Sequence, residues 1–291
     1  MKRNEEKTIV EDVIFNITSG LNKTEFDSTP IKVEDLDLNR FDVIDASKIS
    51  VINFRSKGDI RTIEGVPIQI NFGNMVNGYE FSIPNLTISN TPNIWKNSES
   101  LYISGIYSEN TPICIEAQTL LIDSNNGLKS KRIMRFQDNE YTRNLREDWE
   151  EFNVEWMKYV VWCKICTNEN FRNLLLSTPE NSLIVEDTSF QSGTKKLVWG
   201  AENLELKRVK LDKLKELKAH LTELGIPVRK KYKHQLYNLI HGSGSFSGVN
   251  KMGKILTILR SNLALGTTPD IDYNLLNDKG IYLFGQRLVF E

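Results

Sequence analysis

The chain of 291 residues carries 37 Lys and Arg against 38 Asp and Glu, and 40% of its residues are hydrophobic. This composition is ordinary for a globular protein and supplies enough apolar side chains for one large core or two smaller ones. The balanced charge argues against a protein held on nucleic acid by its overall charge, but it leaves room for a local basic patch.

The terminus, the apolar runs and the cysteines predict a cytoplasmic protein without a membrane segment. The opening residues, MKRNEEKTIVEDVIF, lack the apolar core of a signal peptide. No apolar run approaches the roughly 20 residues of a membrane span. The three cysteines give no disulfide framework. Cys163 and Cys166 form a C-x-x-C without a second pair, so we expect two thiols near one face of a helix rather than a metal site.

The N-terminal third of the chain predicts an extension followed by strands. Residues 1–45 are acidic and irregular, and we interpret them as a loosely packed N-terminal extension to a domain over residues 46–291. SVINF and the alternating VPIQINF predict strands. SESLYISGIYSE predicts a helix with Ser98 as its cap, and EAQTLLIDS predicts a short helix.

The middle of the chain predicts two further helices and a buried strand. From about Asp148, helical spacing connects Trp149, Phe152, Trp156, Val160 and Cys163. ENFRNLLLSTP predicts a helix that stops before Pro179, and SLIVED predicts a buried strand.

A basic helical insertion is expected at about residues 203–247. From Lys207 to His234 the chain has ten Lys or Arg against three Asp or Glu. An apolar stripe at helical spacing runs through Leu211, Leu214, Leu217, Leu221 and Leu224. Two interpretations stay open: an amphipathic surface helix with a solvated basic face, or a basic surface for a phosphate-rich polymer.

The stretch GVNKMGKILTILR fits the opening of a P-loop, G-x-x-x-x-G-K. A P-loop follows a buried strand and continues with Ser or Thr, whereas here we expect a Gly/Ser loop before the stretch and find Ile255 after Lys254. The pattern therefore predicts the start of an amphipathic core helix, with Gly253 inside it where a glycine permits close packing. Asn250 is expected to cap this helix or to reach a ligand.

Candidate chemistry rests on carboxylates, aromatic rings and amides, because no nucleophile triad can be assembled from the sequence. Glu99 lies within NSESLY, Glu186 ends the apolar run of SLIVE, and Trp199-Gly200 follows a second apolar step. Taken singly, residues of these kinds are more often structural than catalytic.

Together the ordered pieces resemble the NADAR (YbiA-like) family. The order is FRSKGD, GNM, SESLY, LKSK, RNLREDWEEF, NFRNLLLSTP, IVE, WGA and GVNKMGKILTILR, over about residues 49–260 with one interruption. The resemblance is closer to the longer members of the DNA ADP-ribosylguanine hydrolase type. It implies a compact, mainly helical α+β fold with small β elements.

The function that the resemblance implies is an N-glycosidase that removes ADP-ribose from a nucleobase, with guanine in DNA as the leading substrate. Its partners would be ADP-ribosylated nucleic acid or an ADP-ribose-like nucleotide, and an ADP-ribosyltransferase toxin as a genetic partner of an antitoxin-like protein. Two alternatives stay open: hydrolysis of phosphoribosylated riboflavin intermediates or free nucleotides, and binding of ADP-ribose or NAD without turnover.

The resemblance also implies roles for single residues. Glu99 is expected to stabilise an oxocarbenium-like state or activate water, and Glu186 to act as a second catalytic acid or to hold a neighbouring loop. The expected substrate-binding residues are Arg55, Lys57, Asn74, Lys129, Lys131, Trp199, Gly200 and Asn250. No metal-ligand cluster is visible, so we expect activity without a metal or cofactor. Lys196 stands where the family has an Asp. This difference would alter the chemistry, or it would leave a protein that binds the substrate without turnover.

Overall fold

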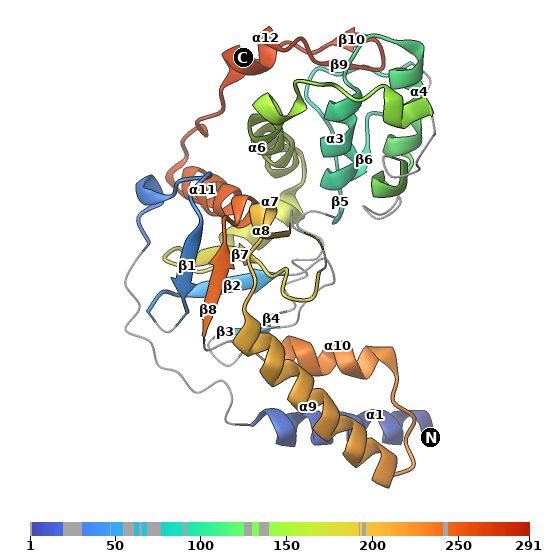
Figure 1. The fold of residues 1–291 in the computed structure, drawn as a ribbon, viewed down its shortest axis with the longest axis vertical. Coiled ribbons are helices and arrows are strands. Elements are labelled where there is room, and N and C mark those ends of the chain that lie inside the picture. The colour runs from blue at the N-terminus through green and yellow to red at the C-terminus, as the bar shows by residue number, and fades with distance from the viewer. Residues whose placement is uncertain are drawn as a thin grey trace. The chain divides into compact units, whose positions relative to one another are not determined.

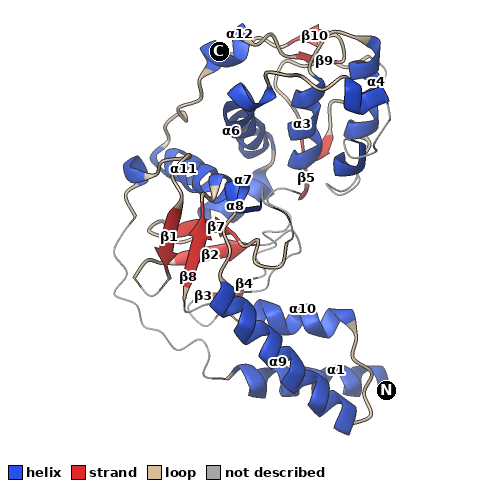
Figure 2. Cartoon of the chain, viewed as in Figure 1, coloured by secondary structure: helices blue, strands red, loops and turns tan. Residues whose placement is uncertain are grey.

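The structure is a computed structural model that describes residues 2–19, 31–46, 48–54, 61–63, 66–68, 77–89, 92–124, 130–133, 140–191, 193, 196–240 and 244–291. The chain folds as two units, and helices and short strands occur in both (Figures 1 and 2). The first unit contains Met1–Asn71 and Asn181–Lys254, and the second contains Phe72–Glu180 and Ile255–Glu291.

The first unit combines short strands with a group of helices. Its elements are α1 (Lys2–Thr18), a 3-10 turn (Val33–Asp35), β1 (Asp42–Asp45), β2 (Val51–Phe54), β3 (Arg61–Ile63), β4 (Val66–Ile68), β7 (Leu183–Glu186), α8 (Lys196–Trp199), α9 (Leu204–Glu223), α10 (Lys230–Leu239), β8 (Ser245–Gly248) and the start of α11 (Lys251–Leu265).

The strands of the first unit pair over long distances in the sequence. β2 and β7 are parallel, with Val51 opposite Leu183 and Phe54 opposite Glu186. β1 and β8 are antiparallel, and single bridges add residues 201 and 202 next to β7 and β8. β7 is buried from Leu183 to Val185, as the apolar run of SLIVE predicts.

Three helices of the first unit, α1, α9 and α10, pack on one another. Their shared core includes Val10 and Ile14 from α1, Leu217 and Leu221 from α9, and Leu236 from α10. The expected N-terminal extension therefore contains a helix with buried apolar residues and is not loosely packed over Lys2–Thr18. The sequence alone did not reveal this because the apolar positions of α1 are few and its partners lie about 200 residues further along the chain.

The second unit is helical with small antiparallel strand pairs. Its elements are β5 (Asn77–Phe81), β6 (Trp95–Asn97), α3 (Ser98–Ser104), a 3-10 turn (Gly105–Tyr107), α4 (Pro112–Ile122), a 3-10 turn (Glu140–Arg143), α6 (Trp149–Thr167), α7 (Glu169–Leu176), α12 (Tyr273–Asp278), β9 (Tyr282–Leu283) and β10 (Gln286–Arg287), with most of α11.

α6 forms the centre of the second unit's core. Phe152, Trp156, Val160 and Cys163 are buried at the helical spacing that the sequence predicts. The 3-10 turn that follows α3 approaches α6 at Gly105, where an added Cβ would lie 2.4 Å from Trp156 Nε1. Only a glycine fits there, so the close approach to α6 depends on the glycine at the end of SESLYISG.

The prediction of a mainly helical α+β fold with small β elements is confirmed, as are the helices at α4, α6, α7 and α11 and the strands at β2 and β7. Three local expectations are wrong. Asn97, not Ser98, caps α3. Leu211 and Leu224 of the predicted stripe are exposed, because α9 buries a narrower face. The Gly/Ser segment before Gly248 is strand β8, whose small residues pair with β1. Across the described residues, no helix is both long and apolar enough to cross a membrane.

Candidate functional site

The second unit holds Glu99, the first of the predicted catalytic acids, in the first turn of α3. Asn97 caps the helix, since its Oδ1 accepts from the Ser100 amide at 2.8 Å and its Nδ2 donates to the Ser124 carbonyl at 2.9 Å. Asn97, Ser98 and Ser100 are buried, so the turn that carries Glu99 is fixed on both sides. An acidic side chain is also favoured at this end of a helix by the helix dipole.

Lys131 lies beside Glu99, at 3.2 Å between its Nζ and Glu99 Oε1. A serine network places it there: Ser130 Oγ lies 2.8 Å from Ser100 Oγ and donates to Ser124 Oγ at 3.0 Å. The Glu99 side chain is 16% exposed, and that of Lys131 is 42% exposed. The acid is therefore shielded on most sides, while its cationic partner keeps donors available to a ligand.

An aromatic pair lies one turn further along α3. The rings of Tyr102 and Trp149 are 4.9 Å apart. Burial raises the pKa of Tyr102, and the negative charge of Glu99 raises it further. Tyr102 therefore stays a neutral phenol beside the carboxylate, and it offers an apolar wall and a hydroxyl group rather than a base.

The sequence analysis missed Lys164, which lies next to this turn. Its Nζ donates to Ser98 Oγ at 3.3 Å and lies 4.8 Å from the centre of the Phe171 ring. Burial lowers the pKa of Lys164 well below its ordinary value. The signal was a lysine in the middle of the apolar face of α6, a position that solvated lysines avoid.

The first unit holds Glu186 and Asn250, which one hydrogen bond connects. Asn250 is fully buried; its Oδ1 accepts from the Glu186 amide at 3.0 Å and its Nδ2 donates to the Ile184 carbonyl at 2.9 Å. Asn250 thus extends the pairing of β7 at its open edge. Gly253 follows in α11, and an added Cβ there would lie 2.1 Å from the Ile184 carbonyl, which confirms its expected close packing.

Trp199 ends α8, and Gly200, which follows it, lies beside the same strand. An added Cβ at Gly200 would lie 2.6 Å from the Glu186 carbonyl, so the glycine permits this approach. Lys196 pairs with Glu202 at 2.5 Å between Nζ and Oε2. Sequence analysis did not identify Glu202, which lies six residues away and comes near only because the chain turns at Gly200.

Lys254, the lysine of the P-loop-like stretch, has no exposed surface. Its Nζ contacts Asp42 Oδ2 at 2.6 Å and donates to the carbonyls of Asp37 and Arg40 at 2.7 and 2.9 Å. This side chain anchors β1 and the segment before it. The conclusion that GVNKMGK is not a P-loop is consistent with these bonds, although a strand does precede it.

The structure therefore brings Glu99 together with Lys131, and Glu186 together with Gly200 and Asn250. Trp199 directly precedes Gly200 at the end of α8. These two sets belong to different units, so their combination into one pocket stays a prediction. Four predicted binding residues lie outside the described residues: Arg55, Lys57, Asn74 and Lys129.

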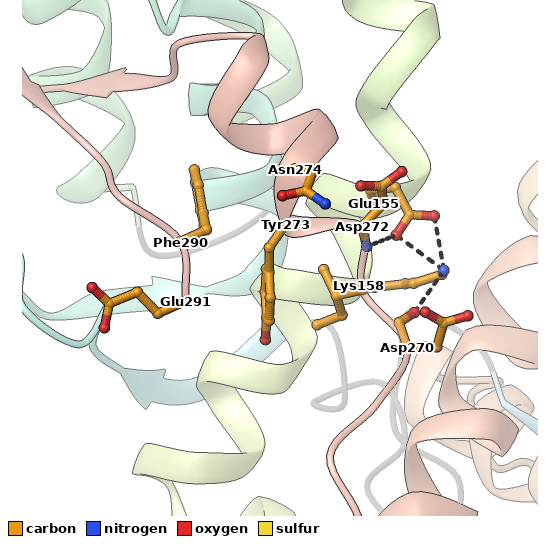
Figure 3. Close-up of a pocket in the computed structure, with 9 residues that line it drawn as sticks. Glu155, Lys158, Asp270, Asp272, Tyr273, Asn274, Phe290 and Glu291 are labelled. Atoms are coloured by element: carbon orange, nitrogen blue, oxygen red, sulfur yellow. Dashed lines mark hydrogen bonds and ion pairs between the residues drawn. The ribbon is translucent and has the colours of Figure 1, made fainter.

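A recess of about 670 Å³ lies elsewhere in the second unit, lined by Glu155, Lys158, Tyr273, Phe290 and neighbouring residues (Figure 3). Glu155 bonds Lys158 and the amide of Asp272, so these charges tie α6 to the segment before α12. None of the predicted site residues lines this recess. Over the described parts of the chain, no group of three His, Cys, Asp or Glu could hold a metal ion, and metal independence stays a prediction.

Comparison with known proteins gives little further information. No family model matches the chain, and no curated protein matches it. Among solved structures, the chain is similar to the NMR structure of the E. coli protein YbiA, with 17% sequence identity over 62% of this chain and 89% of that chain. The TM-score is 0.36, and a similarity at this level supports no statement about function.

Proposed function

We propose that the chain is an N-glycosidase that removes ADP-ribose from a nucleobase, with guanine in DNA as its substrate. The observation that carries the proposal is the Glu99 carboxylate, 16% exposed and 3.2 Å from the Lys131 ammonium. It agrees with the ordered sequence pieces, in which Glu99 occupies the acid position of SESLY.

The chemistry requires one carboxylate next to the ribosyl carbon. The bond between C1 of the ribose and the base nitrogen breaks, and the nitrogen keeps the electron pair and takes a proton from solvent water. Positive charge develops on the ribose, where an ionised Glu99 stabilises it. Water then bonds to C1 and gives a proton to Glu99, which returns it to solvent, so that free ADP-ribose and the unmodified base are released.

The other predicted residues would bind the parts of the substrate next to the ribosyl carbon. Lys131, Arg55, Lys57 and Lys129 would donate to the pyrophosphate, and Asn74 to the ribose hydroxyls. Trp199 would form the stacking wall for the base.

In the first unit the same proposal assigns supporting roles. Asn250 acts as a positioning residue, because its amide bonds the backbone of β7 and thereby fixes Glu186. Gly200 allows α8 to approach that strand. An ADP-ribosyltransferase encoded nearby would be the genetic partner.

The test is incubation of ADP-ribosylated single-stranded DNA with the wild type, Glu99→Gln and the control Glu109→Gln. Glu109 is an exposed glutamate of the same unit, and the substitution removes the same charge. We expect the wild type and Glu109→Gln to release ADP-ribose at equal rates and Glu99→Gln to be slower by at least about a hundredfold. Equal release by all three would remove Glu99 from the mechanism, and no release by the wild type would overturn the proposed activity.

A second candidate is binding of ADP-ribose or NAD without turnover. It is favoured by Lys196, a cation at the position where the family that the sequence resembles has an acid. Lys196 forms an ion pair with Glu202. Calorimetry separates the two candidates: tight binding of ADP-ribose by a wild type that releases none from DNA would support the second candidate.

A further inference from the structure

The first unit carries a recess of about 570 Å³ along one stripe of α9. It is lined by Leu204, Lys207, Arg208, Leu211, Asp212, Leu214, Lys215 and Lys218. Four cations thus face one carboxylate, and Asp212 is paired with Lys215 at 3.0 Å. Leu204 is 62% exposed and Leu211 is 39% exposed. The recess therefore offers an apolar floor with a cationic rim, on a different stripe of the helix from Leu206, Leu217 and Leu221.

An exposed aromatic ring continues this surface. Phe190, 36% exposed, lies 5.3 Å from the Tyr237 ring with an angle of 31° between the planes. The ammonium groups of Lys207 and Lys233 lie 5.6 Å and 5.3 Å from the centres of the Phe190 and Tyr237 rings. Lys207 belongs both to the recess and to the aromatic pair, so the two features are continuous.

The loop that presents Phe190 is held firmly. Asp187 Oδ1 accepts from the amide of Ser189 at 3.0 Å and from its hydroxyl at 2.5 Å. Ser189 Oγ in turn accepts from the Asn203 amide at 2.8 Å, and Asn203 caps α9 through the Leu206 amide. The ring and the start of α9 are therefore fixed to each other before any ligand arrives, which lowers the entropy cost of binding.

We propose that this surface, formed by Phe190, Lys207, Arg208, Lys215 and Lys218, binds single-stranded DNA. A cationic groove that follows the phosphates, combined with an aromatic ring on which a base stacks, is the arrangement that binds single strands without sequence preference. A duplex hides the faces of its bases, so the ring contributes only when a base is unstacked. The choice of DNA rests on the proposed function, whereas the chemistry of the surface does not.

The surface complements the proposed reaction. A base that carries ADP-ribose is reached from outside the stack, so the strand around it has to be held open. With 37 Lys and Arg against 38 Asp and Glu over the whole chain, overall charge does not attract the polymer, and a local cationic surface has to do so. The solvated basic helix that the sequence also allowed would bind no strand.

The experiment measures binding of an unmodified, labelled strand of about 20 nucleotides by fluorescence anisotropy, using the full chain. The variants are Phe190→Ala and the double variant Lys207→Gln/Arg208→Gln. The control Lys32→Gln/Lys48→Gln removes two exposed charges of the same unit that lie outside the packed helices α1, α9 and α10. Circular dichroism confirms that each variant is folded.

We expect the wild type and the control to bind the single strand more tightly than a duplex of the same sequence. The double variant should bind about tenfold more weakly and lower the slope of log affinity against log salt by about 1.4. Phe190→Ala should weaken the single strand roughly fivefold to a hundredfold, and the duplex much less. Equal affinity across all variants, preference for the duplex, or equally tight binding of a polyglutamate peptide would overturn the proposal.

Because the probe carries no ADP-ribose, this result is independent of the proposed activity. Hydrolysis of an ADP-ribosylated guanosine nucleoside completes the separation. The double variant should hydrolyse this small substrate as fast as the wild type and show a higher KM only on the oligonucleotide. Binding without any hydrolysis would support the surface and overturn the proposed activity, whereas equal KM values on the oligonucleotide would overturn the role of the surface.

Discussion

Asn250 and Glu186 are joined through the backbone: the Asn250 side-chain oxygen accepts the Glu186 amide at 3.0 Å. The same side chain donates to Ile184, two residues earlier on the strand. An amide thus takes the place of a neighbouring strand at the end of β7, where one of the two predicted acids lies. Because Asn250 has a φ of 56°, only Asn, Asp or Gly adopts this conformation readily.

Asn250→Gly should destabilise the fold. Glycine accepts the positive φ, so the variant isolates the loss of two buried hydrogen bonds, and we expect the free energy of unfolding to fall by about 2–5 kcal/mol. The measurement is urea denaturation. Asn85→Gly is the matched control, since Asn85 has a φ of 62° and an exposed side chain. Equal midpoints for the two variants would show that the amide of Asn250 does not support β7.

Lys254→Met should also destabilise the fold, since it removes one of the two cations that pair with Asp42 and leaves the carbonyls of Asp37 and Arg40 without this donor. Asp42 keeps partial exposure, so we expect a loss of about 2–4 kcal/mol, less than for a fully buried pair. Burial raises the pKa of Asp42, but the bonds from Lys254 and Arg40 outweigh it and lower the pKa overall. Urea midpoints should show this loss. Lys251→Met, in the same helix, should lie close to the wild type.

The lowered pKa of Asp42 also determines how the stability of the fold depends on pH. A carboxyl whose pKa is lower in the folded protein stabilises the fold above its unfolded pKa, and this contribution disappears as the pH falls through the folded value. The difference in the free energy of unfolding between the wild type and Lys254→Met should therefore become smaller as the pH falls. A gap that stays constant down to about pH 2 would contradict the role of this pair.

The sequence predicts the segments whose pattern is local. The spacing in DWEEFNVEWMKYVVWCK and the apolar run of SLIVE are sufficient for α6 and β7, and Gly253 is recognisable as a close-packing glycine. The cap of α3 was assigned one residue late, because Asn97 and Ser98 are both good caps and only the bond to Ser100 distinguishes them.

The parts that the sequence does not predict depend on contacts between distant residues. β8 reads as a loop because its serines and glycines carry no strand pattern, and pairing with β1 makes it a strand. Lys131 beside Glu99 depends on the contacts of Ser130 with Ser100 and Ser124. Lys196 with Glu202 depends on the turn at Gly200, which no local propensity specifies.

Lys164 should give the wild type a characteristic pH dependence. Burial lowers its pKa in the folded protein well below the unfolded value of about 10.4. Between the two values the unfolded chain binds one more proton, so the free energy of unfolding rises with pH. Lys164→Met lacks this contribution. Urea denaturation near pH 7 and near pH 9 measures how much the free energy of unfolding increases with pH. This increase should be larger for the wild type and for the control Lys96→Met than for Lys164→Met. Equal increases in all three proteins would contradict the lowered pKa of Lys164.

The three thiols should differ in reactivity. Burial raises the pKa of the Cys163 thiol to about 12, and Cys114 is buried as well, whereas Cys166 is exposed. Since the thiolate is the reactive form, a thiol reagent near pH 8 should modify Cys166 alone in the native protein and all three in urea. Rapid modification of Cys163 in the native protein would contradict its burial. Zinc bound at the C-x-x-C would contradict the interpretation of two structural thiols.

In the proposed reaction, Glu99 faces the ribosyl carbon of the substrate. The most direct measurement is a crystal structure of the protein with ADP-ribose bound. We expect the anomeric carbon within about 3.5 Å of a Glu99 carboxylate oxygen, with Lys131 directed at the ligand. ADP-ribose bound with its anomeric carbon against another carboxylate, and with the Glu99–Lys131 pair unchanged and distant from the ligand, would contradict it.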